Sequence, residues 1–207
     1  MSEELSAQQP TRRQRRTAET QTRLLDAAEV VFLCHGYDAV TLAEVTERAD
    51  VGTGTLYLYF RDKRALYEAV VRRALSGLYQ RWQQLVGTEH DGNARVLAMV
   101  KVALEFLAAN PDQARLFLLD GPAAESWLVD DLSKVIASLL EGSQRELRAG
   151  LLVGATLAAA RHHVRDELHP SARTLVEATL GFCAGGLAGS PRRAPAAHRR
   201  GAEKAGR

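Results

Sequence analysis

Hydrophobic positions recur at intervals of three and four along almost the whole chain, a spacing that predicts α-helices. The first clear example spans residues 22–35 and ends before Gly36, a natural stop for a helix. Its apolar face consists of Leu24, Leu25, Ala28, Val31 and Phe32. We expect this helix to be the platform on which the next two helices pack.

The segment that follows predicts two short helices joined by a turn that contains glycine. Thr41 stands where an N-cap belongs, and Glu44 three residues later completes a capping box. The turn falls at 50–52, and a further helix begins at Thr53, where Gly54 leaves the leading end free of bulky side chains. Such a helix N-terminus can approach phosphates or base edges. Two helices in this arrangement are how a small domain reads the major groove of DNA.

The remaining apolar patterns predict a larger helical region. The expected helices span residues 63–85, 94–109, 111–119, 126–140, 147–164 and 171–185. We therefore expect an all-α protein, in which an N-terminal three-helix helix-turn-helix DNA-binding domain precedes a C-terminal helical domain. The expected divisions are a basic flexible arm over 1–18, the DNA-binding domain over 19–65, the C-terminal domain over 66–188 and a basic disordered tail over 189–207.

The net charge of the chain does not indicate a binding partner, but the charge of one short segment does. The 207 residues are 46% hydrophobic, enough for two helical domains, and the net charge is only +2. Positive charge is nevertheless concentrated before the first helix, at Arg12, Arg13, Arg15 and Arg16. Such a segment favours contact with the DNA backbone or the minor groove, and a solvated, disordered tail is the alternative.

The residues of the first third of the chain resemble the tetracycline-repressor (TetR) family of bacterial transcription regulators. A long run of matches at fixed spacing is more specific than any single short motif. The matching residues are Ala27, Ala28, Phe32, Gly36, Tyr37, Thr41 to Val45, Ala49, Val51, Gly54, Leu56, Tyr57, Tyr59, Phe60, Lys63 and Leu66.

This resemblance implies a set of DNA contacts. In similar proteins the helix that matches 53–59 enters the major groove. The residues that match Tyr57 and Thr41 touch phosphates there, and the lysine that matches Lys63 clamps the backbone. The implied contact residues are Thr41, Gly52, Thr53, Gly54, Thr55, Tyr57, Leu58, Tyr59 and Lys63, with Arg12, Arg13, Arg15 and Arg16 of the arm.

Three of these positions depart from many relatives. Gly52 and Thr53 stand where Ser or Lys is common, and Leu58 stands where Tyr or Trp is common. Fewer long polar side chains predict that shape and backbone contacts carry more of the specificity than direct base readout. Other roles remain open for two further positions: Tyr57 is alternatively a half-buried packing residue, and Lys63 an ordinary solvated lysine.

The two C-terminal expected helices, over 147–164 and 171–185, have small residues on more than one face. A helix that is apolar beyond one stripe has to hide its second face, and a two-fold dimer built as a four-helix bundle does so. The resemblance implies the same homodimer. The expected interface residues are Ala155, Ala158, Ala159, His162, Leu175, Ala178, Thr179 and Phe182. A wholly intramolecular core is the alternative.

The resemblance also implies that the middle helices enclose a pocket for a small-molecule effector. The expected lining residues are Trp82, Met99, Glu105, Phe106, Arg115, Phe117 and Trp127. No cluster of like charge indicates an ionic ligand, so an apolar or amphipathic molecule is expected. A helical stripe of ordinary core residues also explains every one of these aromatic positions.

The sequence offers little for catalysis or metal binding. The densest set of possible metal ligands is His162, His163, Asp166, Glu167 and His169. These residues lie at a polar helix end, where such side chains are common, so neither a metal nor another cofactor is expected. The sequence contains no phosphate-cradling loop, nucleophile elbow or pair of carboxylates in an apolar setting, and we do not expect an enzyme.

Localisation follows from the apolar runs. None approaches the roughly 20 residues that cross a bilayer, and no signal peptide is evident, so no membrane association is expected and the protein is predicted to be cytoplasmic. Cys34 and Cys183 both lie in apolar helical patterns and are expected to be buried thiols.

The combined expectation is a ligand-responsive, sequence-specific DNA-binding regulator. We expect a repressor that an apolar or amphipathic effector releases from a palindromic operator. One alternative on the same fold is an activator or a ligand-independent DNA-binding protein with an architectural or division-control role. Another is a helical adaptor that binds only protein.

Overall fold

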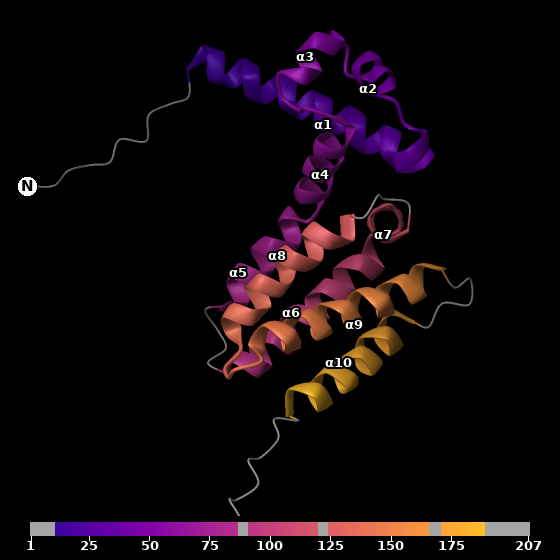
Figure 1. Cartoon of the computed structure of the whole chain (residues 1–207). Helices are drawn as coiled ribbons and strands as arrows, with labels where there is room; N and C mark the ends of the chain where they lie inside the picture. Colours follow the sequence, from indigo (N-terminus) through magenta and orange to yellow (C-terminus); the bar gives the residue numbers. More distant parts are fainter. Residues whose placement is uncertain (1–10, 87–90, 120–123, 166–170, 189–207) are drawn as a thin grey trace, which may run out of the picture.

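The computed structural model describes residues 11–86, 91–119, 124–165 and 171–188, and the regular elements in these ranges are all α-helices. A head of α1, α2 and α3 is joined through α4 to a bundle of α5 to α10 (Figure 1). In chain order the helices are α1 (Arg12–Ala39), α2 (Leu42–Arg48), α3 (Thr53–Tyr57), α4 (Lys63–Ala74), α5 (Ser76–Val86), α6 (Gly92–Ala109), α7 (Pro111–Leu118), α8 (Ala124–Leu139), α9 (Arg145–Arg165) and α10 (Ala172–Ala188). The predicted all-α class is confirmed.

The head packs around a small apolar core. Its fully buried members include Leu24, Phe32, Val45 and Leu56. The predicted capping box opens α2, since the Thr41 hydroxyl accepts from the Glu44 amide and the Glu44 carboxylate accepts from the Thr41 amide. The turn to α3 places Asp50 in the left-handed region, at φ 50°. Asp tolerates this conformation better than most residues because its short polar side chain forms local hydrogen bonds.

The start of α1 differs from the prediction. A capping box between Thr11 and Gln14 begins the helix at Arg12, so the expected flexible arm is helical from that residue onward. Residues 1–10 of the arm and the predicted tail over 189–207 lie outside the described ranges. Because a capping box satisfies two of the unpaired amides at a helix start, it fixes where the helix begins even in a charged, exposed segment.

Two helices of the bundle also differ from the prediction. The expected connecting helix over 63–85 is divided at Leu75 into α4 and α5. The expected helix over 147–164 is slightly longer at each end, since α9 spans Arg145–Arg165 and continues through Gly150 and Gly154. Tertiary packing overrides local helix propensity at these places, because a buried helix gains most of its stability from its apolar face.

The bundle is centred on α6 and α9, which both pack against α7, α8 and α10. Trp82 of α5 is buried and its Nε1 donates to the Met99 carbonyl of α6 at 3.0 Å. Cys183 is buried as predicted, and burial raises the pKa of its thiol. Cys34, however, is exposed, because it lies on the outer side of α1. No helix among the described residues is long and apolar enough to span a membrane.

A buried tyrosine fastens the head to the bundle. Tyr67 of α4 donates its hydroxyl to the Leu116 carbonyl of α7 at 2.9 Å. Its ring meets those of Phe32 and Tyr37 of α1 edge-on, with centroids 5.3 and 5.1 Å away. Since α4 serves both parts, the expected division between residues 65 and 66 falls inside one helix and stays a prediction.

The start of α6 generates a test of the packing. A Cβ on Gly92 would collide with the Leu139 carbonyl oxygen at the end of α8. We expect Gly92→Ala to lower the free energy of unfolding by about 1–3 kcal/mol, the usual cost of overpacking. The matched control is Gly77→Ala on α5, whose Cβ would meet nothing within 4 Å. That change should be neutral or stabilising by up to about 1 kcal/mol. Urea denaturation measures both, and equal stabilities would contradict the close approach.

Candidate nucleic-acid interface and ligand cavity

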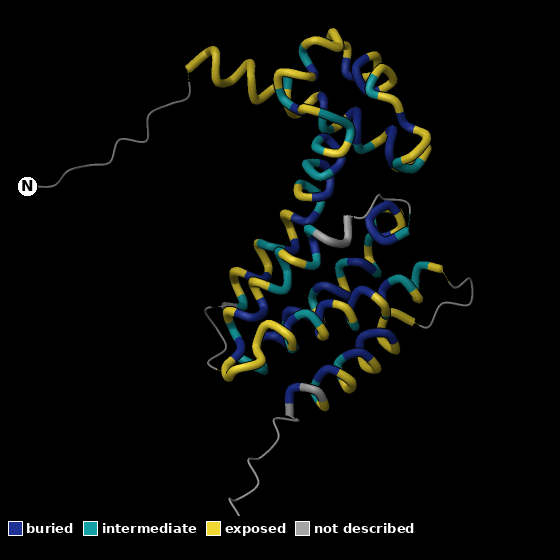
Figure 2. The backbone as a smooth tube through the Cα atoms, in the orientation of Figure 1, coloured by how far each residue is buried: buried dark blue, intermediate teal, exposed yellow. Residues whose placement is uncertain are grey.

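The end of the head that is remote from the bundle carries the exposed residues of α3 (Figures 1 and 2). We call residues 52–58 the recognition tip. Gly52, Thr53 and Gly54 are exposed there, whereas Thr55 is half-buried. Tyr57 is 54% exposed and Leu58 82% exposed. Large apolar side chains exposed beside open backbone indicate a contact surface.

Two of the expected contact residues have partners within the head. The Thr41 amide and hydroxyl both donate to the Glu44 carboxylate, at 2.7 and 2.9 Å. Both bonds lower the pKa of the Glu44 carboxyl group, and the bond from the Thr41 amide has the larger effect. The bonds that the Glu44 carboxylate accepts are therefore present at neutral pH and weaken as the pH falls through that lowered pKa, whereas the bond from the Glu44 amide to the Thr41 hydroxyl does not depend on this charge. A phosphate at Thr41 has to compete with this carboxylate.

Lys63 is also engaged inside the head. Its Nζ donates to the carbonyls of Asp38 and Val40 at 3.0 and 2.8 Å, and it lies 4.5 Å from the centre of the Tyr37 ring. The ammonium group thus closes the end of α1 onto the start of α4. This role was not predicted, because the partners are backbone carbonyls more than twenty positions away.

Four arginines form what we call the basic helix start: Arg12, Arg13, Arg15 and Arg16. All four are exposed, and the first turn of α1 contains no acidic residue (Figure 2). Cations at a helix N-terminus oppose the helix dipole, so this arrangement costs stability unless an anion lies nearby. Three of them line one surface depression with the half-buried Tyr59, which places the basic helix start beside the recognition tip.

Arg23 holds the turn between α2 and α3. Its Nη2 donates to the carbonyl oxygens of Ala49 and Asp50 at 2.5 and 2.9 Å. The guanidinium therefore supports the left-handed residue of the turn and orients the recognition tip. The helical pattern contains no sign of this contact, because α1 supplies the arginine and the turn lies 26 residues later.

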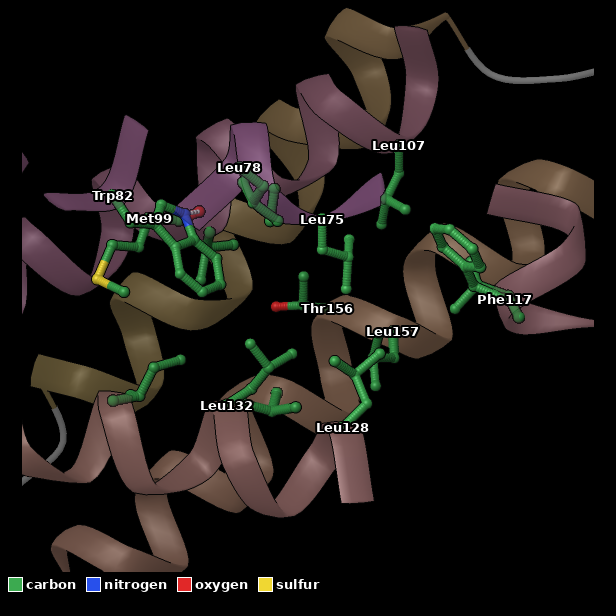
Figure 3. Close-up of a pocket in the computed structure, with 15 residues that line it drawn as sticks. Leu75, Leu78, Trp82, Met99, Leu107, Phe117, Leu128, Leu132, Thr156 and Leu157 are labelled. Atoms are coloured by element: carbon green, nitrogen blue, oxygen red, sulfur yellow. Dashed lines mark hydrogen bonds between the residues drawn. The ribbon is translucent and has the colours of Figure 1, made fainter. Parts of the chain in front are cut away.

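An apolar cavity lies inside the bundle, and its wall includes Leu75, which follows the C-terminal end of α4. Figure 3 shows the side chains that line it. Its volume is about 50 Å³, and only apolar atoms face it. The Thr156 hydroxyl donates to the Leu152 carbonyl at 2.7 Å and is thereby satisfied. The lining residues are Leu75, Leu78, Trp82, Met99, Val100, Ala103, Leu107, Phe117, Leu118, Leu128, Leu132, Ile136, Val153, Thr156 and Leu157.

The structure places three of the seven expected pocket residues on this cavity, namely Trp82, Met99 and Phe117. The other four lie outside this cavity, and their role at an effector site stays a prediction. Glu105 is half exposed and faces Lys101, with 3.9 Å between the charged atoms. Trp127 lies under the guanidinium of Arg72, 4.2 Å from the ring centre. Phe106 is only partly buried, and Arg115 lines a separate surface cleft. The helical stripe turns these side chains away from the cavity axis.

The aliphatic wall residues were not identified from the sequence. Leu75, Leu128 and Ile136 follow the same helical stripes as ordinary core residues, and nothing in their spacing separates a cavity wall from a filled core. Among the described residues no group of three or more His, Cys, Asp and Glu is placed to hold a metal ion. Asp166, Glu167 and His169 lie outside the described residues.

We call the exposed side of α9 and α10 the outer face. It carries three large exposed apolar side chains, Leu147, Leu151 and Phe182, which are 61%, 64% and 71% exposed. A shallow groove of about 470 Å³ runs beside Phe182 and Leu151 and is lined in part by Gly154 and Ala158. The outer face therefore combines protruding side chains with a groove of small residues.

The expected interface residues divide between the outer face and the core. Ala158, His162, Ala178 and Phe182 are exposed, and Ala155 and Ala159 are half-buried. Leu175 and Thr179 are instead buried within the protomer, where the Thr179 hydroxyl donates to the Leu175 carbonyl at 2.8 Å. These two expectations are corrected, because both residues lie on the side of α10 that packs against the rest of the bundle.

Comparison with known proteins gives matches over the head and over most of the chain. The family model described as bacterial regulatory proteins, tetR family, matches residues 24–70. The HTH-type transcriptional activator FasR of Mycolicibacterium smegmatis is 28% identical over 186 residues, 84% of this chain and 85% of FasR. The HTH-type transcriptional repressor BepR of Brucella suis is 30% identical over 173 residues, 82% of this chain and 79% of BepR.

Solved structures share the fold. The transcriptional regulator FadR of Bacillus subtilis, solved in complex with stearoyl-CoA, superposes with a TM-score of 0.63. It is 16% identical in sequence, and the match covers 80% of this chain and 98% of FadR. At that identity the likeness concerns the arrangement of the helices.

Lys63 provides a test of the geometry of the head. Lys63→Met keeps the aliphatic stem and removes the two charged hydrogen bonds, so we expect the free energy of unfolding to fall by about 1–3 kcal/mol. Lys101→Met is the matched control, because that lysine is exposed and its pair with Glu105 is long. Its effect should stay within about 0.5 kcal/mol. If thermal or urea unfolding of Lys63→Met equals that of the control, the lysine does not hold α1 to α4.

Proposed function

Because the chain belongs to the TetR family of transcription regulators, we propose that it is a homodimeric repressor that leaves a palindromic operator when a small apolar effector binds. The observation that carries this proposal is the relative position of the exposed end of the head, the cavity and the outer face. The recognition tip and the basic helix start lie together at one end, the cavity lies at the far end of α4, and the outer face lies on α9 and α10. Acting on DNA, such a regulator works in the cytoplasm.

The leading end of the recognition tip, at 52–54, suits the major groove because its small side chains leave the backbone open to solvent. Thr53, Gly54 and Thr55 would lie nearest the bases, and Tyr57 and Tyr59 would meet the phosphates. Leu58 is the most exposed large apolar residue of the tip, and it suits contact with a thymine methyl group. The basic helix start adds charge that no acid in its turn offsets, and phosphates would relieve the unfavourable interaction with the helix dipole.

Salt dependence tests the DNA face. Replacing the four arginines of the basic helix start with Gln should weaken binding to the intergenic DNA beside the gene. The slope of log affinity against log salt should fall by about 0.9 for each phosphate that the variant no longer neutralises. The control is Arg81→Gln with Lys101→Gln, since both residues are exposed on the bundle, on α5 and α6, away from the head and the outer face. Fluorescence anisotropy at several salt concentrations measures both. An unchanged slope in the quadruple variant would remove the basic helix start from the DNA face.

The outer face supports a two-fold dimer. A related copy would place Phe182 of one protomer against the small-residue groove of the other, which is the self-complementary contact that a two-fold axis requires. Small residues at 154 and 158 permit close approach of the helices. Two copies of the recognition tip, presented by one dimer, would read two half-sites about one turn of DNA apart.

Phe182 provides the test of the dimer. Phe182→Glu places a charge in the proposed contact, so sedimentation should show a monomer at concentrations at which the unmodified chain is a dimer. Val135→Glu on α8 is the control, because it makes the same kind of change at a residue that is 42% exposed outside the outer face. A dimer of unchanged stability in Phe182→Glu would place the interface elsewhere.

The cavity defines the kind of effector. A charge buried among apolar atoms without a counter-ion is strongly disfavoured, so an uncharged, hydrocarbon-like part of the effector would enter. The stearoyl-CoA in the related FadR structure carries such a part. At about 50 Å³ the cavity is smaller than the roughly 150 Å³ that accommodates benzene. Binding therefore has to move the walls apart.

The effector would act by population shift. A ligand that prefers the widened cavity, in which the heads no longer match the operator, would lower DNA affinity by its preference for that state, commonly about 1–3 kcal/mol. An activator is the second candidate, because FasR bears that name. Transcription in vitro from the adjacent promoter, with and without the protein, distinguishes a repressor from an activator.

A further inference from the structure

A single carboxylate joins the head to two walls of the cavity. Glu29 of α1 accepts from Arg73 Nη2 of α4 at 2.5 Å and from Gln113 Nε2 of α7 at 3.0 Å. The second guanidinium nitrogen of Arg73 donates to Asp26, one turn earlier on α1, at 2.6 Å. The Glu29 side chain is 24% exposed and that of Arg73 30% exposed, so water only partly screens these contacts.

Both partners of Glu29 lie close in sequence to cavity walls. Arg73 precedes the wall residue Leu75 by two positions, and Gln113 precedes the wall residue Phe117 by one helical turn. Leu75 caps α4, and its amide still donates to the Val71 carbonyl at 3.0 Å, while Gln113 and Phe117 lie in the same helix. Displacement of either wall residue therefore also displaces the group that is bonded to Glu29. Because the ligand-free cavity is small, any ligand that enters has to displace its walls.

The neighbouring contacts act as a pivot. Tyr67, Phe32 and the Leu116 carbonyl form a buried junction between the same three helices, one turn further along α1. Close-packed rings resist separation, whereas the bonds at Glu29 join long, polar side chains at the protein surface. A change in the angle between α1 and α7 would therefore alter the Gln113–Glu29 contact first.

We propose that Glu29 couples the cavity to the DNA-binding head: widening of the cavity moves Gln113 relative to Arg73, and the carboxylate passes that movement to α1. This inference rests on the proposed function only in that movement of the head is taken to change DNA binding. The movement itself is a property of the helices and is measurable without DNA. Gln113 is a positioning residue in this account, since it touches neither DNA nor effector.

The experiment uses a cavity-filling substitution in place of the unidentified effector. Ala103→Leu adds bulk to the α6 wall of the cavity, and Ala103→Val is the smaller step should the leucine variant unfold. We expect the substitution to weaken binding of the adjacent intergenic DNA about 5- to 150-fold, the usual range of allosteric coupling. Adding Gln113→Ala should reduce that effect to less than about 3-fold, while Gln113→Ala alone leaves affinity nearly unchanged. Gln83→Ala, which removes an exposed amide from α5, is the control and should leave the effect intact.

A second measurement does not depend on DNA. The exposed Cys34 accepts a spin label and the buried Cys183 does not, so each head of a dimer carries one label. Ala103→Leu should change the distance between labels by several ångström, and Gln113→Ala should abolish that change. If the filled cavity shifts neither the distance nor the affinity, or if Gln113→Ala leaves both shifts intact, the inference is overturned. Failure of the unmodified chain to bind DNA, with the distance change present, would overturn the proposed function alone.

Discussion

The hydrogen bond from Tyr67 to the Leu116 carbonyl is the contact on which the arrangement of the two parts depends. A buried hydroxyl without an acceptor carries a desolvation cost of about 1–3 kcal/mol, so this bond strongly fixes the distance between α4 and α7. The rings of Phe32 and Tyr37 then fix α1 against the same tyrosine. With three helices held at one point, the remaining freedom of the head is rotation about that point rather than sliding.

Features that the sequence revealed are those formed by residues close together in the chain. The capping box at Thr41 and the break inside α1 at Gly36, where φ is 72°, depend on residues close together in the chain, so their pattern is visible before folding. The contacts of Lys63, Arg23 and Glu29 join residues 23 or more positions apart. Long charged side chains have many possible partners, and only the assembled helices select one.

The same dependence on nearby residues explains why the head was easier to predict from the sequence than the cavity. The helices and the turn of the head were predictable because a helix-turn-helix has caps, a turn and buried apolar residues at fixed spacings along the chain. The cavity was predictable only in part: the expected Trp82, Met99 and Phe117 line it, but most of its wall consists of aliphatic residues that serve equally well in a filled core. Polar residues such as Glu105 attracted attention in the sequence, yet a helix turns them to solvent and leaves the aliphatic residues inside.

The length of α1 gives the Tyr67 junction a mechanical consequence. From Phe32 to Arg12 the helix rises about 30 Å, at about 1.5 Å per residue. A tilt of about 6° at the junction therefore moves its arginine end about 3 Å, close to the rise of about 3.4 Å along the duplex axis for each phosphate of one strand. The helix acts as a lever, so a small rotation at its base is enough to move its charged end by about one base-pair rise along the duplex axis.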